Sequence, residues 1–216
     1  MFGLSDRLQA IYDQIPKCNV FCDCGCDHGK IIVKAVQEGK CERGVAIDIS
    51  KPSLQKSKTL AEEYGVDSKI EFICADGLQS VKQTCDVVAI CGMGAAEIIK
   101  IISNAKIQPE YYLLLPHNYP YRLRRFLLEN GFRPEFDKVI KDGEKYYHLI
   151  MVTKKATDSF DSSAIYVGKD NRLDNVDFIS YLNYRITQLS KIVKYNDDKE
   201  LNEEYKILTN IQRGLK

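Results

Sequence analysis

The amino-acid sequence predicts an α/β fold: a mostly parallel, seven-stranded sheet with an antiparallel hairpin at one edge, followed by a C-terminal two-helix, coiled-coil-like hairpin. Three observations predict this class. Short apolar runs of strand length alternate with amphipathic stretches from residue 19 onward. The runs lack polar alternation, which is typical of strands that are buried on both faces. An Asp-Gly turn then joins two further strand-like segments, and two helical patterns end the chain.

Five apolar runs are expected to form parallel strands, and the amphipathic stretches between them are expected to form helices that cover the sheet. The second helix has Ser50 as its N-cap and Pro52 in its first turn, where a missing N–H costs nothing. The fourth helix stops at Asn130-Gly131, a typical C-terminal signal. The strands are expected at 20–24, 45–49, 70–74, 87–91 and 111–115, and the helices at 29–38, 52–64, 95–104 and 119–130.

Further elements flank this alternating region. Residues 4–15 carry apolar side chains on one side and predict a short amphipathic helix. Segments 136–141 and 146–153 flank Asp142-Gly143, which predicts an antiparallel hairpin at the sheet edge. Together these elements define a predicted main domain, residues 1–155.

Residues 156–216 are expected to form a second, helical unit. The stretch 154–171 is polar and rich in turn-forming residues, so it predicts a linker. Beyond it, apolar residues recur at threes and fours, with an interruption at 196–198, which predicts two antiparallel helices. A hairpin of two helices buries little surface alone, so we expect it to lean on the main domain as well.

Composition sets limits on the partners. The chain has 216 residues, of which 44% are apolar and 28% charged, as expected for a soluble globular protein. Lys and Arg number 31 and Asp and Glu 30, so any nucleic acid must be held by a local basic patch. The sequence has no apolar run long enough for a membrane span and no signal-peptide pattern at its start. We therefore expect a cytoplasmic protein with no membrane association, and no obligate protein partner is evident.

The cysteines are expected to be reduced thiols. Three of them form Cys22-x-Cys24-x-Cys26, a spacing that would place all three on one face of a strand. Zinc sites usually combine Cys-x-x-Cys with a second pair downstream, and the sequence has neither. We therefore predict that no metal is bound. The eight cysteines are at positions 18, 22, 24, 26, 41, 74, 85 and 91.

The turn after the first expected strand carries the most informative motif. Asp23-Cys24-Gly25-Cys26-Asp27-His28-Gly29 stands where doubly wound folds bind nucleotide-like ligands. A dinucleotide site has a second glycine where this chain has Asp27, whose carboxylate would repel pyrophosphate. A nicotinamide-dependent oxidoreductase is therefore disfavoured. The same carboxylate suits a cationic ligand such as S-adenosylmethionine.

Three more features lie where a methyl donor would need them. Asp48 ends the second strand and can accept hydrogen bonds from both ribose hydroxyls. Asp76, beside Gly77 after the third strand, can accept from the adenine amino group. Gly92-Met93-Gly94 follows the fourth strand, where the reactive end of the donor meets the substrate. Because the carboxyl ends of parallel strands share one edge, these features predict a single site.

The composite resembles class I S-adenosylmethionine-dependent methyltransferases and, within them, the bacterial TrmK family. That family methylates N1 of adenine 22 in the D arm of tRNA. The resemblance covers nearly the whole chain, including the C-terminal hairpin, and it implies S-adenosylmethionine as cofactor and tRNA as partner. The matching stretches are Asp23-Cys24-Gly25-Cys26-Asp27-His28, Ala75-Asp76-Gly77-Leu78, Gly92-Met93-Gly94-Ala95, Leu123-Arg124-Arg125-Phe126-Leu127 with Gly131-Phe132, and Tyr146-Tyr147.

The sequence departs from the family pattern at three places. Gly29-Lys30 stands where the family usually has Ala-Tyr, and Ala95 replaces the last glycine of its GMGG. Pro116-His117-Asn118 stands where the family usually reads Gln-Pro-Asn, so only Asn118 is in register.

These residues predict a set of roles. N1 of adenine carries a lone pair and needs no base, so alignment is the main demand, and a carboxylate can stabilise the developing cationic ring. The expected catalytic residues are Asp27, which is alternatively only a cofactor ligand, together with His28 and Asn118. The expected RNA-binding residues are Lys30, Arg122, Arg124 and Arg125, and the C-terminal hairpin is an expected tRNA clamp. The expected cofactor-binding residues are Asp23, Gly25, Asp27, His28, Asp48, Ile49, Ala75, Asp76, Gly77, Cys91, Gly92 and Met93.

Two other functions are compatible with the sequence. One is a methyltransferase that acts on a small molecule and uses the helical hairpin as a lid or a dimer contact. The other is a catalytically silent RNA-binding protein that has kept the fold, for which the altered Pro116-His117-Asn118 segment is the only argument.

Overall fold

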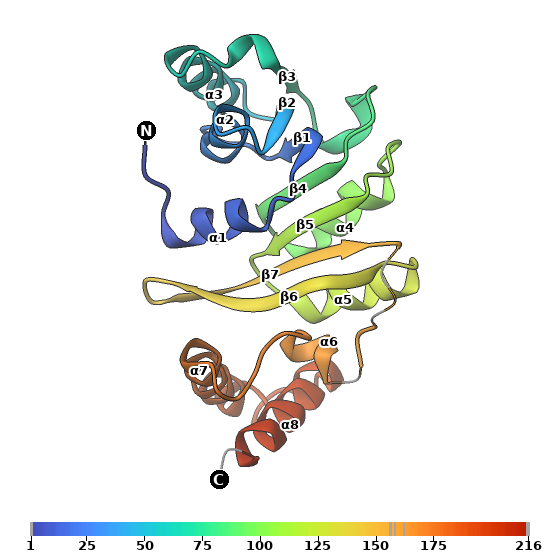
Figure 1. Cartoon of the computed structure of the whole chain (residues 1–216). Coiled ribbons are helices and arrows are strands. Elements are labelled where there is room, and N and C mark those ends of the chain that lie inside the picture. Colours follow the sequence, from blue (N-terminus) through green and yellow to red (C-terminus); the bar gives the residue numbers. More distant parts are fainter. Residues whose placement is uncertain (1, 156, 158, 162, 215–216) are drawn as a thin grey trace.

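The computed structural model describes residues 2–155, 157, 159–161 and 163–214. It contains one seven-stranded sheet in the order β3-β2-β1-β4-β5-β7-β6 (Figure 1). The strands are β1 (Cys18–Cys24), β2 (Cys41–Asp48), β3 (Ile70–Cys74), β4 (Val87–Met93), β5 (Tyr111–Pro116), β6 (Arg133–Asp142) and β7 (Lys145–Thr153). The α-helices are α1 (Asp6–Gln14), α2 (Lys30–Gln37), α3 (Lys51–Glu63), α4 (Ala95–Ser103), α5 (Pro120–Glu129), α6 (Ala164–Val167), α7 (Val176–Ile192) and α8 (Lys199–Arg213).

The predicted fold class is confirmed. Strands β1 to β5 are parallel, and β7 lies antiparallel between β5 and β6. The chain order reverses at β1, which pairs with β2 on one side and with β4 on the other. In open α/β sheets, ligands bind outside the carboxyl ends of the strands at such a switch point.

Two apolar layers cover the sheet, one on each face. Helices α1, α2 and α3 pack on one face, where Phe21, Ile32 and Leu113 belong to a single buried cluster. Helices α4 and α5 pack on the other face, where Val88 and Ile98 belong to a second cluster (Figure 1). Burial on both faces explains why the parallel strands lack polar alternation.

Local signals set the helix boundaries much as predicted. The Ser50 side chain accepts a hydrogen bond from the Ser53 N–H and caps α3, with Pro52 in its first turn. Helix α5 ends at Glu129, and Gly131 adopts a φ of +79°, a left-handed conformation that glycine enters without strain.

Cys22, Cys24 and Cys26 were expected to share one face of a strand, and the structure does not place them so. Cys22 and Cys24 lie in the α4/α5 cluster, whereas Cys26 lies in the opposite cluster with α2. The prediction was wrong for Cys26 because β1 ends at Cys24 and Gly25 turns the chain with a φ of +83°. All eight cysteines are free thiols.

The stretch 154–171 is more than a linker. Its described part includes α6, whose residues are all buried, and Phe160, which packs in the α4/α5 cluster. Helix α7 then packs on the edge strand β6, and α8 packs on α7 and α6, with a third apolar cluster between them (Figure 1). The cluster joins Val139 of β6 to Val167, Phe178, Tyr181, Leu182, Leu189 and Leu208.

A buried polar network fastens this junction. The Arg124 guanidinium donates to both carboxylate oxygens of Asp137 at 2.7 and 2.8 Å, and both side chains are fully buried. It also donates to the carbonyl oxygens of Ile165 and Tyr166 in α6. The prediction that Arg124 contacts RNA was therefore wrong, because its charge is sealed in an ion pair and has no access to a phosphate.

His148 extends the network into α7. Its Nδ1 lies 2.9 Å from Nη2 of Arg124, and its Nε2 lies 3.1 Å from the Tyr181 hydroxyl. Arginine can only donate, so Nδ1 must accept, and the proton of the neutral ring is on Nε2. Burial, together with the nearby charges of Arg124 and Arg185, lowers the pKa of His148 well below its usual value. Across the described residues, no helix is long and apolar enough to cross a membrane.

Candidate active site

Two adjoining cavities lie at the carboxyl ends of β1 to β4. The Asp48 cavity measures about 370 Å³, and the Asp23 cavity measures about 380 Å³. Gly25, Cys91 and Gly92 line both. Each of the twelve residues predicted to bind the cofactor lines at least one of the two cavities. The structure therefore brings the predicted residues together at one edge of the sheet.

The turn after β1 needs its glycines. Gly25 has a φ of +83°, and a Cβ there would stand 2.4 Å from Cε of Met93. Gly29 has a φ of +68°, and a Cβ there would stand 2.0 Å from the Ser57 hydroxyl oxygen in α3. The departure from the family's alanine at Gly29 thus has a packing reason. Asp27 also has a positive φ of 48°, which aspartate tolerates better than most residues.

Asp48 is held rigidly at the end of β2. Its Oδ2 accepts a hydrogen bond from the backbone N–H of Asp27 at 2.9 Å, and its Oδ1 accepts from the N–H of Ser50 at 2.8 Å. Each carboxylate oxygen has a second lone pair, so both remain able to accept from ligand hydroxyls. The carboxylate is therefore aimed by the backbone of two neighbouring turns.

Asp23 and Asp27 share the second cavity but differ in environment. Asp23 is buried, and desolvation, assisted by the charges of Asp48 and Asp27, raises its pKa to about 7. The Asp27 side chain is 73% exposed, and its Oδ1 lies 3.6 Å from Nε2 of His28. The N-cap of α2 is Gly29, and none of the described side chains caps that helix, so Asp27 is not a helix cap.

The floor of the Asp48 cavity combines an acid with apolar surface. The Asp76 carboxylate pairs with the Lys100 ammonium at 3.3 Å, and its side chain is 57% exposed. Gly77 has a φ of +77°, and a Cβ there would approach Ile101 to 3.2 Å. Ile49 is 71% exposed, unusual for an isoleucine, and it lines this cavity. An exposed aliphatic side chain beside an acceptor suits a flat aromatic ring that carries an amino group.

Asn118, in the loop after β5, was predicted to be a catalytic residue, but the structure places it outside the two cavities. The Asn118 side-chain oxygen accepts from the N–H of Ala95 at 3.2 Å, so Asn118 caps α4 from outside the helix. Asn118 is not among the described residues that line either cavity. His117 does line the Asp23 cavity, and burial, followed by the positive charge of Arg7, lowers its pKa.

The residues predicted to bind RNA lie in two different places, one at the cavity and the others against the C-terminal hairpin. Lys30 is exposed and lines the Asp23 cavity. Arg122 and Arg125 both pair with Glu200 of α8, at 2.8 and 2.6 Å, so they brace the C-terminal hairpin against α5. Tyr121, which precedes Arg122 on α5, is only 1% exposed, so its ring belongs to the core.

Sequence reasoning missed the contribution of α1. Arg7, Leu8 and Ile11 line the Asp23 cavity, although the segment was predicted only to be a short amphipathic helix. The periodicity of a short helix shows which side is apolar, but it does not show which strand ends the helix reaches. Only the tertiary position of α1 reveals this wall of the cavity.

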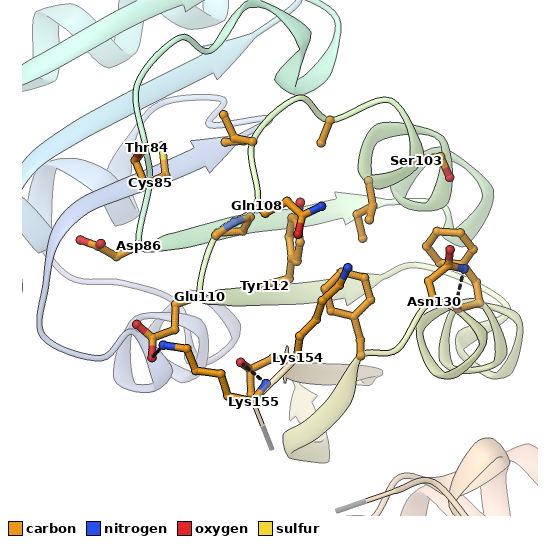
Figure 2. Close-up of a pocket in the computed structure, with 17 residues that line it drawn as sticks. Thr84, Cys85, Asp86, Ser103, Gln108, Glu110, Tyr112, Asn130, Lys154 and Lys155 are labelled. Carbon is orange, nitrogen blue, oxygen red and sulfur yellow. Dashed lines mark hydrogen bonds and ion pairs between the residues drawn. The ribbon is translucent and has the colours of Figure 1, made fainter. Parts of the chain in front are cut away.

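The structure's described ranges also bear on metal binding. There, no group of three or more His, Cys, Asp or Glu is arranged to hold a metal ion. A further cavity of about 510 Å³, larger than either of the two at the carboxyl ends, lies at the opposite ends of β4 and β5 (Figure 2). There, Lys155 pairs with Glu110 at 2.9 Å, and Lys154 stacks over the Phe132 ring.

The family follows from the comparison with known proteins. Residues 4–150 match the model of the methyltransferase domain. The chain belongs to this methyltransferase-domain family. The match includes β1 to β5 with the two cavities at their carboxyl ends, so the cavities occupy the cofactor-facing edge of a methyltransferase domain.

Individual relatives extend the comparison beyond the methyltransferase domain. A Bacillus subtilis protein named tRNA (adenine(22)-N(1))-methyltransferase is 28% identical over 152 residues, which span 68% of this chain and 64% of that protein. A putative tRNA methyltransferase of Mycoplasma pneumoniae is 28% identical over 154 residues, 70% of each protein. The fold matches that of M. capricolum TrmK in complex with S-adenosyl-homocysteine, with a TM-score of 0.85, 24% identity and coverage of 99% of both chains. The whole fold, including the C-terminal helices, is thus shared with that protein.

Proposed function

We propose that this protein transfers a methyl group from S-adenosylmethionine to N1 of adenine 22 in the D arm of tRNA. One observation carries the proposal: all twelve expected cofactor residues line two joined cavities in a chain whose curated relatives are named tRNA methyltransferases. The tRNA and the position of the base come from those relatives. The assignment of S-adenosylmethionine as methyl donor rests on the residues that line the two cavities.

The cavities fit the proposed cofactor. The left-handed turn at Gly25 lets the backbone approach a ligand closely, because it carries no Cβ. Asp48, aimed by two backbone N–H groups, would hold the ribose hydroxyls. Asp76 and the exposed Ile49 would hold the amino group and the face of the adenine. The donor supplies a methyl group on a cationic sulfonium.

The residues of the Asp23 cavity account for the rest of the reaction. Adenine N1 attacks through its own lone pair, so the protein must orient it and need not remove a proton first. The exposed carboxylate of Asp27 at the cavity rim would stabilise the positive charge that develops on the base. His28 and His117 both line the Asp23 cavity and would flank the base there. His117 is one of the residues in which this chain differs from the family pattern. Asn118 positions the Gly92-Met93-Gly94 loop by capping α4.

The C-terminal helices would hold the tRNA body as a clamp. We place this role in residues 172–216, whose helix α7 packs on β6 and whose helix α8 is braced to α5 through Glu200. The base must leave its stack to reach the cavity, and a second contact on the tRNA would hold the D arm during that step. The buried Arg124 network then sets the position of the clamp relative to the cavity.

A methyl-transfer assay tests the proposal. The protein is incubated with S-adenosylmethionine carrying a labelled methyl group and with unmodified tRNA transcripts that have adenine at position 22. We expect label in tRNA, 1-methyladenosine after nuclease digestion, and a reverse-transcription stop at position 22. A matched transcript with guanine at position 22 is the control and should remain unlabelled. Label at another nucleotide, or none in tRNA, would overturn the proposed substrate.

A further inference from the structure

Tyr119, between β5 and α5, has a strained backbone conformation. Its φ of 45° and ψ of 49° lie in the left-handed region, which bulky side chains rarely enter. Pro120 follows as the first residue of α5, and a proline further restricts the backbone of the residue before it. Glycine or asparagine would make the same turn with less strain. The turn alone therefore gives no reason for a tyrosine, and strain of this kind is typical of functional sites.

The Tyr119 side chain is an aromatic surface that the protein supports but does not cover. It is 45% exposed. The Arg122 guanidinium lies over the ring, 4.7 Å from its centroid, and the Tyr121 ring packs against it almost at right angles. Arg122 is held in turn by Glu200 of α8 at 2.8 Å. The ring is thus oriented by neighbours on α5 while much of it remains accessible to a partner.

Tyr119 lies close to the Asp23 cavity without lining it. His117, two residues earlier, lines this cavity, so the Cα atoms of His117 and Tyr119 are at most about 7 Å apart. The backbone N–H of His117 donates to the carbonyl oxygen of Met93 at 2.8 Å, and Asn118 caps α4, so the segment before Tyr119 is fixed to the loop after β4. Tyr119 itself is not among the described residues that line either cavity. Its ring is therefore placed to contact a group that stays outside the cavity.

We propose that Tyr119 stacks on the base next to adenine 22 of the tRNA, an inference that rests on the proposed function. An adenine that leaves its stack to enter the cavity exposes the face of a neighbouring base. An aromatic side chain can cover such a face whatever the base, because every base has a π-face. The adenine itself lies inside the cavity, which Tyr119 does not line, so the neighbour is the base within reach. Tyr119 thereby stabilises the RNA in the state in which the adenine has left its stack.

Tyr119→Asn separates this role from a structural one. Asparagine tolerates the left-handed conformation and removes the ring, so urea should unfold the variant at the wild-type concentration or a higher one. Its affinity for unmodified tRNA, measured with S-adenosylhomocysteine present, should fall about 10- to 100-fold, as expected for one lost base–aromatic stack. Its affinity for S-adenosylhomocysteine alone should stay within about twofold. Tyr119→Phe keeps the ring and is the matched control, and its tRNA affinity should also stay within about twofold.

A thermodynamic cycle between residue and RNA identifies the stacked base. Two tRNAs, each lacking the base on one side of adenine 22, are compared with the complete tRNA for binding to the wild type and to Tyr119→Asn. In the wild type, one of the two abasic tRNAs should bind about 10- to 100-fold more weakly than the complete tRNA. In Tyr119→Asn, that abasic tRNA and the complete tRNA should bind with similar affinity. Equal losses in the two proteins would mean that Tyr119 does not contact the base, and would overturn the inference.

The outcomes separate this inference from the proposed function. If Tyr119→Asn binds and methylates tRNA as well as the wild type does, the inference falls and the proposed function stands. If Tyr119→Phe loses as much tRNA affinity as Tyr119→Asn, the ring is not what binds, and the inference falls as well. If the wild type neither binds nor methylates tRNA, both proposals fall. Tyr119→Leu keeps an apolar side chain without a ring, and it carries the cycle if Tyr119→Asn does not fold.

Discussion

The carboxyl ends of β1 to β4 and the junction between β6 and the C-terminal helices use the same residue types in opposite ways. At the strand ends, the Asp27 side chain is 73% exposed, and the Asp48 oxygens keep free lone pairs after accepting from the backbone. At the junction, Asp137 and Arg124 are fully buried and satisfy one another. The carboxylates at the strand ends can therefore still accept hydrogen bonds from a ligand, whereas the polar groups at the junction are already hydrogen-bonded to each other.

Remaining hydrogen-bond capacity, rather than residue type, therefore separates a binding site from a structural network. Arg124 and Arg7 are both arginines on amphipathic helices. Arg124 donates to Asp137 and to two backbone carbonyls, so a phosphate would have to replace partners that are already close. Arg7 has a buried nitrogen with no acceptor among the described residues and faces a cavity.

Arg124→Met should produce the largest effect on stability. It leaves the Asp137 carboxylate buried without its partner, and breaking a buried pair in this way typically costs about 3–5 kcal/mol. Urea unfolding at 25 °C measures the free energy of unfolding. The two cavities at the carboxyl ends of the strands lie elsewhere, so we expect the affinity for S-adenosylhomocysteine to stay within about twofold wherever the variant is folded.

Arg122→Met is the matched control for this test. Arg122 lies on the same helix and pairs with Glu200, but its side chain is 48% exposed. An exposed pair contributes about 0–1 kcal/mol, so the variant should lose no more than that. If Arg122→Met and Arg124→Met were equally destabilising, the buried network would not be what fastens the junction.

Asp27→Asn should show the reverse pattern. Asparagine tolerates the positive φ of 48° and keeps the size of the side chain, so the free energy of unfolding should change by less than about 0.5 kcal/mol. Removal of one preorganised charge should lower turnover on the order of 10²-fold. Single-turnover methyl transfer, compared with calorimetry of the donor, separates turnover from binding.

Two results would revise the role of Asp27. Equal losses in donor affinity and in turnover would make Asp27 only a cofactor ligand. Full activity in Asp27→Asn would remove the residue from the chemistry altogether, although the structure already shows that it does not cap α2.

Most of the sheet and of its ligand edge could be predicted because their signals are local. A buried run such as 87–91 predicts a strand by itself, and Asp48 at the end of such a run predicts its own position at the sheet edge. The twelve residues predicted to bind the cofactor converge for this reason: each lies at the carboxyl end of a strand or just after it, and these strands are parallel.

The junction could not be predicted because its partners come from distant segments. Arg124 is sealed by Asp137, His148 and the carbonyl oxygens of α6, which only the tertiary fold brings to it. One local signal existed, since Arg124 lies three residues after Tyr121 and three before Leu127 and therefore on the buried face of α5. Arg7 gave no such signal, because its place in the wall of the Asp23 cavity depends on where α1 lies relative to the strand ends.

The last comparison of the two regions is through the pH dependence of stability. Asp23 has a pKa of about 7 in the folded protein and about 3.9 when unfolded, so the folded state holds an extra proton between these values. Its contribution is complete below about pH 4 and is lost as the pH rises through 7. His148 has a folded pKa well below 6.5, so the unfolded state takes up the extra proton and stability is lost as the pH falls below 6.5. Between about pH 4 and 6.5 the two contributions oppose each other, each by about 1.4 kcal/mol per pH unit.

Two single variants should each remove one of the opposing contributions to the pH dependence of the free energy of unfolding. Asp23→Asn removes the penalty of charging a buried carboxyl, so its stability relative to wild type should rise as the pH goes from 5 to 7. His148→Gln can still accept from Arg124 and donate to Tyr181, and its relative stability should fall over the same range. Urea unfolding at pH 5, 6 and 7 measures both differences, and the other titrating groups cancel because all three proteins share them. A pH-independent difference for either variant would mean that its side chain does not titrate as its burial requires, and the contrast between the open cavity and the sealed junction would then lose its electrostatic basis.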